Sequence, residues 1–147
     1  MGRWLVIVWA LIAFPFWFSA ATGGPAGLMP HALFHPVYIL FAIGAILALL
    51  SLRSATNARV VRWLAIALVV SQAAAILGQV GEELVVLQHG GLAAGMEVFD
   101  QPLHELSAYV TILPGLLASQ ILLIALTIAA VLAMRAERRL AAAPSPI

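Results

Sequence analysis

The chain has no cysteine and no lysine, and charged residues make up only 9% of its 147 residues. Without cysteine there is no disulfide, thiolate metal site, iron–sulfur cluster or cysteine nucleophile. There is no glycine-rich phosphate loop, and a net charge of +1 gives no basic excess for binding nucleic acid. What remains is 64% hydrophobic residues, more than a soluble domain of this length can bury, which indicates an integral membrane protein.

Four long apolar runs are separated by short polar or glycine-containing segments. Each run is long enough to cross a bilayer as a helix, which requires about 20 residues. We therefore predict an all-α fold, a single domain over residues 1–147 that forms an integral membrane bundle of four transmembrane helices in contact with lipid. The predicted spans are about 4–21, 36–52, 63–88 and 103–134.

The first apolar run allows a second interpretation. Arg3, the run from Trp4 to Phe14 and the small residues Ser19-Ala20-Ala21 also fit a signal peptide with its cleavage site. The aromatic residues of the segment favour a retained helix with interfacial anchors at its ends. Cleavage would leave the topology of the other three spans unchanged.

Charge is distributed unevenly between the two sides of this topology. All seven basic residues fall on one side, and because cytoplasmic loops carry an excess of arginine and lysine, we expect both termini to be cytoplasmic. Five of the six acids and all four histidines fall on the other side, which we expect to face outward. The arginines are Arg3, Arg53, Arg59, Arg62, Arg135, Arg138 and Arg139.

Glu82 is the most unusual residue within a span. About 20 residues after Trp63, it should lie near the outer boundary of the bilayer. Small residues Ser71, Ala75 and Gly78 share its helix face, so we expect Glu82 to point into the bundle. The polar residues of this helix are expected to form interhelical hydrogen bonds, or alternatively a polar pathway for protons or ions that stops near Gln72.

The histidines occur next to sequence signals for helix boundaries. His31 and His35 are four residues apart, which would place them on one helix face, but Pro36 favours a helix that begins at residue 36. Asp100 and Pro102 suggest a helix start with an aspartate cap, and Pro114-Gly115 is expected to interrupt the fourth span.

These observations lead to a prediction of a ligand site at the outer face. Imidazoles with one or two carboxylates suit zinc, copper or iron, and paired histidines could ligate haem b. The predicted metal ligands are His31, His35, Glu82 and His104, with Glu83, His89 and Glu105 in reserve.

Two further hypotheses stay open: a non-catalytic accessory subunit of a larger membrane complex, and a small homo-oligomeric channel or transporter. No motif decides whether the protein is an enzyme.

Overall fold

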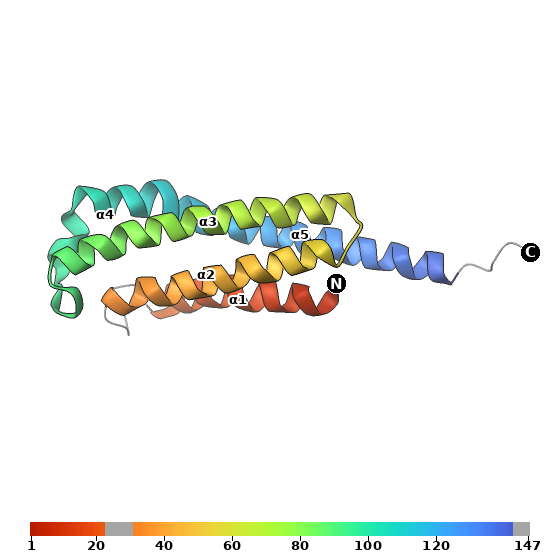
Figure 1. The fold of residues 1–147 in the computed structure, drawn as a ribbon, viewed down its shortest axis with the longest axis horizontal. Coiled ribbons are helices and arrows are strands. Elements are labelled where there is room, and N and C mark those ends of the chain that lie inside the picture. The colour runs from red at the N-terminus through yellow and green to blue at the C-terminus, as the bar shows by residue number, and fades with distance from the viewer. Residues whose placement is uncertain (23–30, 143–147) are drawn as a thin grey trace, which may run out of the picture.

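In the computed structural model, which describes residues 1–22 and 31–142, four long helices run along one axis (Figure 1). All four are long and apolar enough to cross a membrane, so the predicted all-α transmembrane bundle is confirmed. The fourth helix is continuous from Pro102 to Ala141, but it contains a π-helical segment between two α-helical segments. The elements are α1 (Gly2–Thr22), α2 (His31–Ser54), α3 (Arg59–Gln88), and, within the fourth helix, α4 (Pro102–Leu106), the π-helix η4 (Ser107–Ile112) and α5 (Leu113–Ala141).

The connection between α3 and α4 contains two short 3-10 helices, η2 (Gly91–Ala93) and η3 (Met96–Asp100). Gly90 and Gly91, which follow the end of α3, have φ of 109° and 59°, a conformation that glycine adopts without strain. The expected aspartate cap is wrong. Asp100 ends η3, Gln101 is the N-cap residue of α4 with no side-chain cap hydrogen bond, and Pro102 occupies the first helical position.

Two prolines that were expected to mark helix boundaries, Pro36 and Pro114, lie inside helices instead. The helix α2 begins at His31 rather than at Pro36, and Pro36 lies inside it. A proline there removes one backbone donor near the start of the helix, which leaves the carbonyl of Ala32 without its usual helical partner. Within a bilayer the helical path is retained because no water is present to solvate backbone groups that leave it.

The fourth helix is likewise not interrupted at Pro114-Gly115. Pro114 lies in the first turn of α5, and the π-helix η4 ends directly before α5 begins. A proline ring normally clashes with the carbonyl four residues earlier, here that of Val110, and the wider π turn accommodates it. The predicted break at Pro114-Gly115 is therefore wrong: the helix continues, and it changes from a π-helix to an α-helix just before Pro114.

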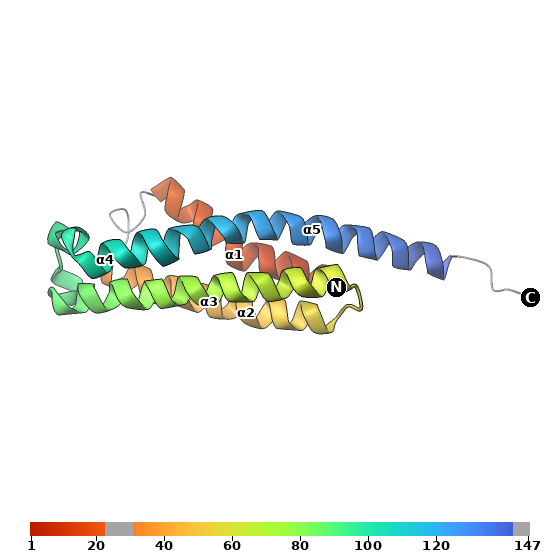
Figure 2. The ribbon, with the colours of Figure 1, turned by 90° about the horizontal axis from the view of Figure 1, so that it is seen from above.

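Neighbouring helices are antiparallel, so the bundle has two distinct ends (Figures 1 and 2). We call the end formed by the start of α1, the α2–α3 turn and the end of α5 the arginine end, because it carries all seven arginines. The opposite end, which carries His35, His89 and His104, is the histidine end. The helix α1 runs obliquely to the other three in Figure 2, and α5 extends beyond them at the arginine end.

The core of the half towards the arginine end is almost entirely aliphatic. It includes the fully buried Leu49, Leu52, Leu68, Leu123 and Leu126. Further along the axis a polar layer joins α3 to α5. There Ser71 Oγ donates to the Gly115 carbonyl (2.7 Å), and Gln72 Nε2 donates to Ser119 Oγ (2.7 Å). The predicted interhelical hydrogen bonds are thus present.

Candidate functional site

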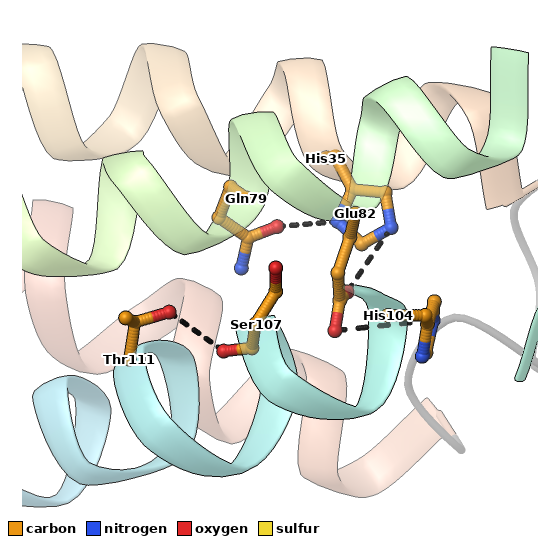
Figure 3. A network of polar contacts seen from close by, with 6 residues as sticks. All are labelled: His35, Gln79, Glu82, His104, Ser107 and Thr111. Atoms are coloured by element: carbon orange, nitrogen blue, oxygen red, sulfur yellow. Dashed lines mark hydrogen bonds and ion pairs between the residues drawn. The ribbon is translucent and has the colours of Figure 1, made fainter. Parts of the chain in front are cut away.

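Two glycines of α3 allow the π-helix to pack directly against it. A Cβ atom at Gly78 would overlap Thr111 Oγ1 and Ile112 Cγ1, and one at Gly81 would overlap Ser107 Oγ. The predicted small-residue face of α3 is therefore a real contact face. π-Helical turns are rare and occur frequently at functional sites, and this one lies opposite Glu82 (Figure 3).

His35 of α2 is fully buried between two polar residues of α3. Its Nδ1 lies 2.5 Å from Gln79 Oε1, and its Nε2 lies 3.3 Å from Glu82 Oε2 (Figure 3). Because the Gln79 oxygen is an acceptor, His35 Nδ1–H donates to it, which directs Nε2 towards the carboxyl group. A proton on either atom would relieve the repulsion between the lone pairs of Nε2 and Oε2.

The second carboxyl oxygen of Glu82 faces a histidine from a different helix. His104 Nε2 lies 3.8 Å from Glu82 Oε1, and the His104 ring packs edge-on against Phe99 with a centroid distance of 5.0 Å. Only 4% of Glu82 and 6% of His104 are exposed. One buried carboxyl group is therefore placed between imidazoles of α2 and α4.

A cavity of about 380 Å³ adjoins this cluster. Its polar wall is formed by Gln79, Glu82, His104 and Glu105, with Ser19 of α1. Four aromatic side chains line the remainder together with aliphatic residues of the fourth helix, and no arginine lines it. These aromatic residues are Phe34, Tyr38, Phe99 and Tyr109.

The aromatic wall is held in place by contacts between helices. Tyr38 donates its hydroxyl hydrogen to the carbonyl of Pro15, which ties α2 to α1. Phe34 stacks on Tyr38, with ring centroids 4.6 Å apart, and meets His35 edge-on. The cavity walls are therefore anchored by the same elements that position the histidine–glutamate cluster.

The loop at this end adds stable negative charge. The Glu97 carboxylate accepts hydrogen bonds from its own backbone amide and from that of Gly95 (2.9 Å for the latter), and these bonds lower the pKa of Glu97. Glu97 therefore stays ionised down to a lower pH than an ordinary glutamate. Glu105 adds a second acidic residue at this end, and it lines the cavity.

Three of the four predicted site residues come together: His35, Glu82 and His104. The side chain of His31 lies outside the described residues. Among the reserves, Glu105 lines the cavity, Glu83 is half-buried beside Glu82 without lining it, and His89 Nδ1 is bonded to the Val85 carbonyl (2.8 Å) at the end of α3.

The sequence predicts interhelical hydrogen bonds for the polar residues of α3, and the bond from Gln79 to His35 is one of them. The sequence does not identify His35 as the partner, 44 residues away, and it does not predict the aromatic wall. The aromatic side chains come from α2, η3 and η4, and no spacing within the chain connects them. Their common location becomes visible only when the helices are packed.

The part of the chain that the structure describes contains no group of three or more histidine, cysteine or acidic side chains arranged to hold a metal ion. A haem held by two histidines would need its iron between the two ring nitrogens. Here the Glu82 carboxyl group lies against both His35 Nε2 and His104 Nε2, so haem b does not fit this arrangement.

Comparisons with protein-family models, with curated proteins and with solved structures find no match. The assignment of function therefore depends on the chemistry of the histidine end and on the membrane-spanning fold.

Proposed function

We propose that this multi-pass membrane protein binds a small cationic ligand at the histidine end, and that an amphipathic organic cation is the class that suits the cavity best. The observation that carries the proposal is the composition of the cavity wall: Glu82 and Glu105 with four aromatic rings and no arginine. A volume of about 380 Å³ falls within the range of small-molecule sites and greatly exceeds that of a single metal ion.

Aromatic and acidic groups recognise the two parts of such a ligand. Ring faces attract cations, more strongly where water is excluded, and they also contact apolar groups. A carboxylate supplies the opposite charge that a cation needs when it leaves water. The combination favours a ligand with a positive centre and a hydrophobic body over an anion or a neutral acceptor.

The contact between His35 and Glu82 gives this binding a link to protons. A proton shared between Nε2 and Oε2, which lie 3.3 Å apart, would occupy the position where a cation interacts with Glu82. A bound cation stabilises the ionised carboxylate and so favours release of that proton. We therefore expect cation binding to strengthen as pH rises.

Equilibrium binding of tetraphenylphosphonium to the purified protein in lipid nanodiscs tests the proposal. We expect saturable binding that Glu82→Gln weakens at least about tenfold, equivalent to about 1.4 kcal/mol. The matched control Glu83→Gln removes a neighbouring carboxylate that does not line the cavity, and it should bind normally. Equal affinity in both variants, or equal binding of neutral triphenylphosphine oxide, would refute an organic-cation site.

A transition-metal ion is the second candidate, favoured by one distance. Two ligand atoms bound to one tetrahedral zinc at about 2.0–2.2 Å lie about 3.4 Å apart. The separation between His35 Nε2 and Glu82 Oε2 is 3.3 Å, although His104 would have to move closer to share the ion. The donor set suits zinc, copper(II) or iron, with the predicted ligand His31 as a fourth group.

The two ligand classes can be separated with one further variant. Phe99→Leu removes an aromatic wall but no metal donor, so it should weaken binding of tetraphenylphosphonium and leave zinc affinity unchanged. Metal analysis of a fresh preparation, followed by zinc titration of the protein and of His104→Ala, tests the metal directly. Absence of bound metal together with no zinc affinity would rule out this second candidate.

A further inference from the structure

The arginine end contains a second, chemically opposite pocket. A cavity of about 390 Å³ lies at the turn between α2 and α3. It is lined by Arg53, Asn57, Arg59, Arg62, Trp63 and Ile66. Three arginines therefore line a single pocket. The tendency of arginines to lie on the cytoplasmic side explains why they share one end of the bundle, but not why three of them line one pocket.

The convergence follows from the helix geometry. Arg59, Arg62, Trp63 and Ile66 have the spacing i, i+3, i+4 and i+7, so they form one face of α3. Arg53 lies in the last turn of α2, on the other side of a short connection. Within that connection the Ala58 amide donates to the buried Thr56 Oγ1 (3.1 Å), which supports the turn that brings the two helices together.

These arginines have no ionic partner within the described part of the chain, where the ion pairs that occur involve only His35, His104 and Glu82. In addition, Arg53 Nε is buried and has no hydrogen-bond partner among the described residues. Because three arginines without an ionic partner in residues 1–22 and 31–142 surround one pocket, their positive charge would attract an anionic group from outside the chain.

We propose that this pocket binds the phosphate group of an anionic phospholipid in the leaflet that borders the arginine end. Arginine is suited to phosphate because its planar group donates two parallel hydrogen bonds. Basic pockets between transmembrane helices are typical sites for anionic headgroups. The site is independent of the cation site, which lies at the opposite end of the bundle.

The order of residues along α3 favours a lipid over free phosphate. Arg59 and Arg62 lie at the helix start, and the apolar Trp63 and Ile66 follow deeper along the same face. Trp63 is 60% exposed, as is typical of tryptophan at the level of lipid headgroups. This sequence of cationic and then apolar groups matches a phosphate followed by its glycerol and acyl chains.

Lipid retention tests the proposal. The purified protein is equilibrated with mixed micelles of phosphatidylglycerol and phosphatidylcholine, and bound lipid is measured by native mass spectrometry. We expect the intact chain to prefer phosphatidylglycerol, and Arg53→Gln combined with Arg59→Gln to reduce that preference at least fivefold. The control Arg138→Gln with Arg139→Gln removes the same charge from the end of α5 and should retain the preference.

Three outcomes would overturn the lipid site. The first is equal retention of both lipids by the intact chain, and the second is an equal loss in the two double variants, which would indicate diffuse charge. The third is displacement of phosphatidylglycerol by inorganic phosphate at similar concentration, which would indicate a site for free phosphate. Arg62→Gln alone provides a milder variant should the double variant fail to fold, and it should show a smaller loss of preference.

Discussion

The two halves of this bundle are built from the same four helices but are packed in different ways. Towards the arginine end, leucine and alanine side chains fill the core. Towards the histidine end, Gly78 and Gly81 bring the backbones of α3 and η4 close together, and the buried side chains include His35, Gln79 and Glu82. From this difference we expect the aliphatic half to contribute most of the stability, and the proposed ligand site lies in the polar half.

The two ends also differ in charge in a way that suits different ligands. The arginine end has guanidinium groups around a pocket and is suited to phosphate. The histidine end has a carboxyl group between two imidazoles beside an aromatic cavity and is suited to cations. Each pocket faces a different side of the membrane if the helices cross it as their length allows.

The sharpest test of this division is the orientation of the ends, where the effect is all or none. The chain has no cysteine, so single replacements can be labelled without background. An impermeant thiol reagent added outside intact cells should label Ala93→Cys, in the loop of the histidine end, but not Ser54→Cys at the arginine end. Labelling of Ser54→Cys from outside would reverse the predicted topology, including the cytoplasmic position of both termini.

The stability of the aliphatic half is tested by two leucines on the same helix. Leu126 is fully buried, whereas Leu132 is 58% exposed on the surface available to lipid. Leu126→Ala should lower the free energy of unfolding by about 2–5 kcal/mol because it leaves a cavity, and Leu132→Ala should have little effect. Thermal unfolding in detergent measures both. Binding of tetraphenylphosphonium below the unfolding temperature should be unchanged, and loss of binding in Leu126→Ala would show that the two halves are not separable.

The close packing of the polar half is tested by a pair of glycines. A Cβ at Gly78 would overlap Thr111 and Ile112, whereas a Cβ at Gly44 comes no closer than 3.4 Å, to the end of the Leu11 side chain. Gly78→Ala should therefore destabilise the protein by about 1–3 kcal/mol through overpacking. Gly44→Ala should be neutral or slightly stabilising, since alanine favours a helix more than glycine does. Similar unfolding temperatures for the two variants would contradict the contact between α3 and η4.

Most of the fold was predictable because apolar length and small-residue spacing are local properties. The four spans and the inward direction of Glu82 follow from them, and both are confirmed. The errors concern Pro36, Pro114 and Asp100. General rules for proline and for caps describe helices in water, whereas here the surrounding helices and the π turn accommodate the prolines.

The site was predictable only as a set of residues that share one end. The sequence groups His31, His35, Glu82 and His104 at the outer face, and the structure brings the last three of them together. Their pairing depends on the rotation of each helix about its axis, which no single-helix pattern determines. For the same reason the sequence predicts that polar residues of α3 bond to other helices but not that Gln79 pairs with His35, and it does not predict the aromatic wall.

The central claim is that Glu82 holds a proton that a cation displaces, and proton release on binding measures this directly. Binding of tetraphenylphosphonium in weakly buffered solution near neutral pH should acidify the medium in proportion to the cation bound. His35, His104 and Glu105 also face this position, so Glu82→Gln is the decisive variant: it should bind weakly and release no proton at saturation. The account would be contradicted if the intact protein bound the cation without releasing a proton, or if Glu82→Gln released as many protons as the intact protein.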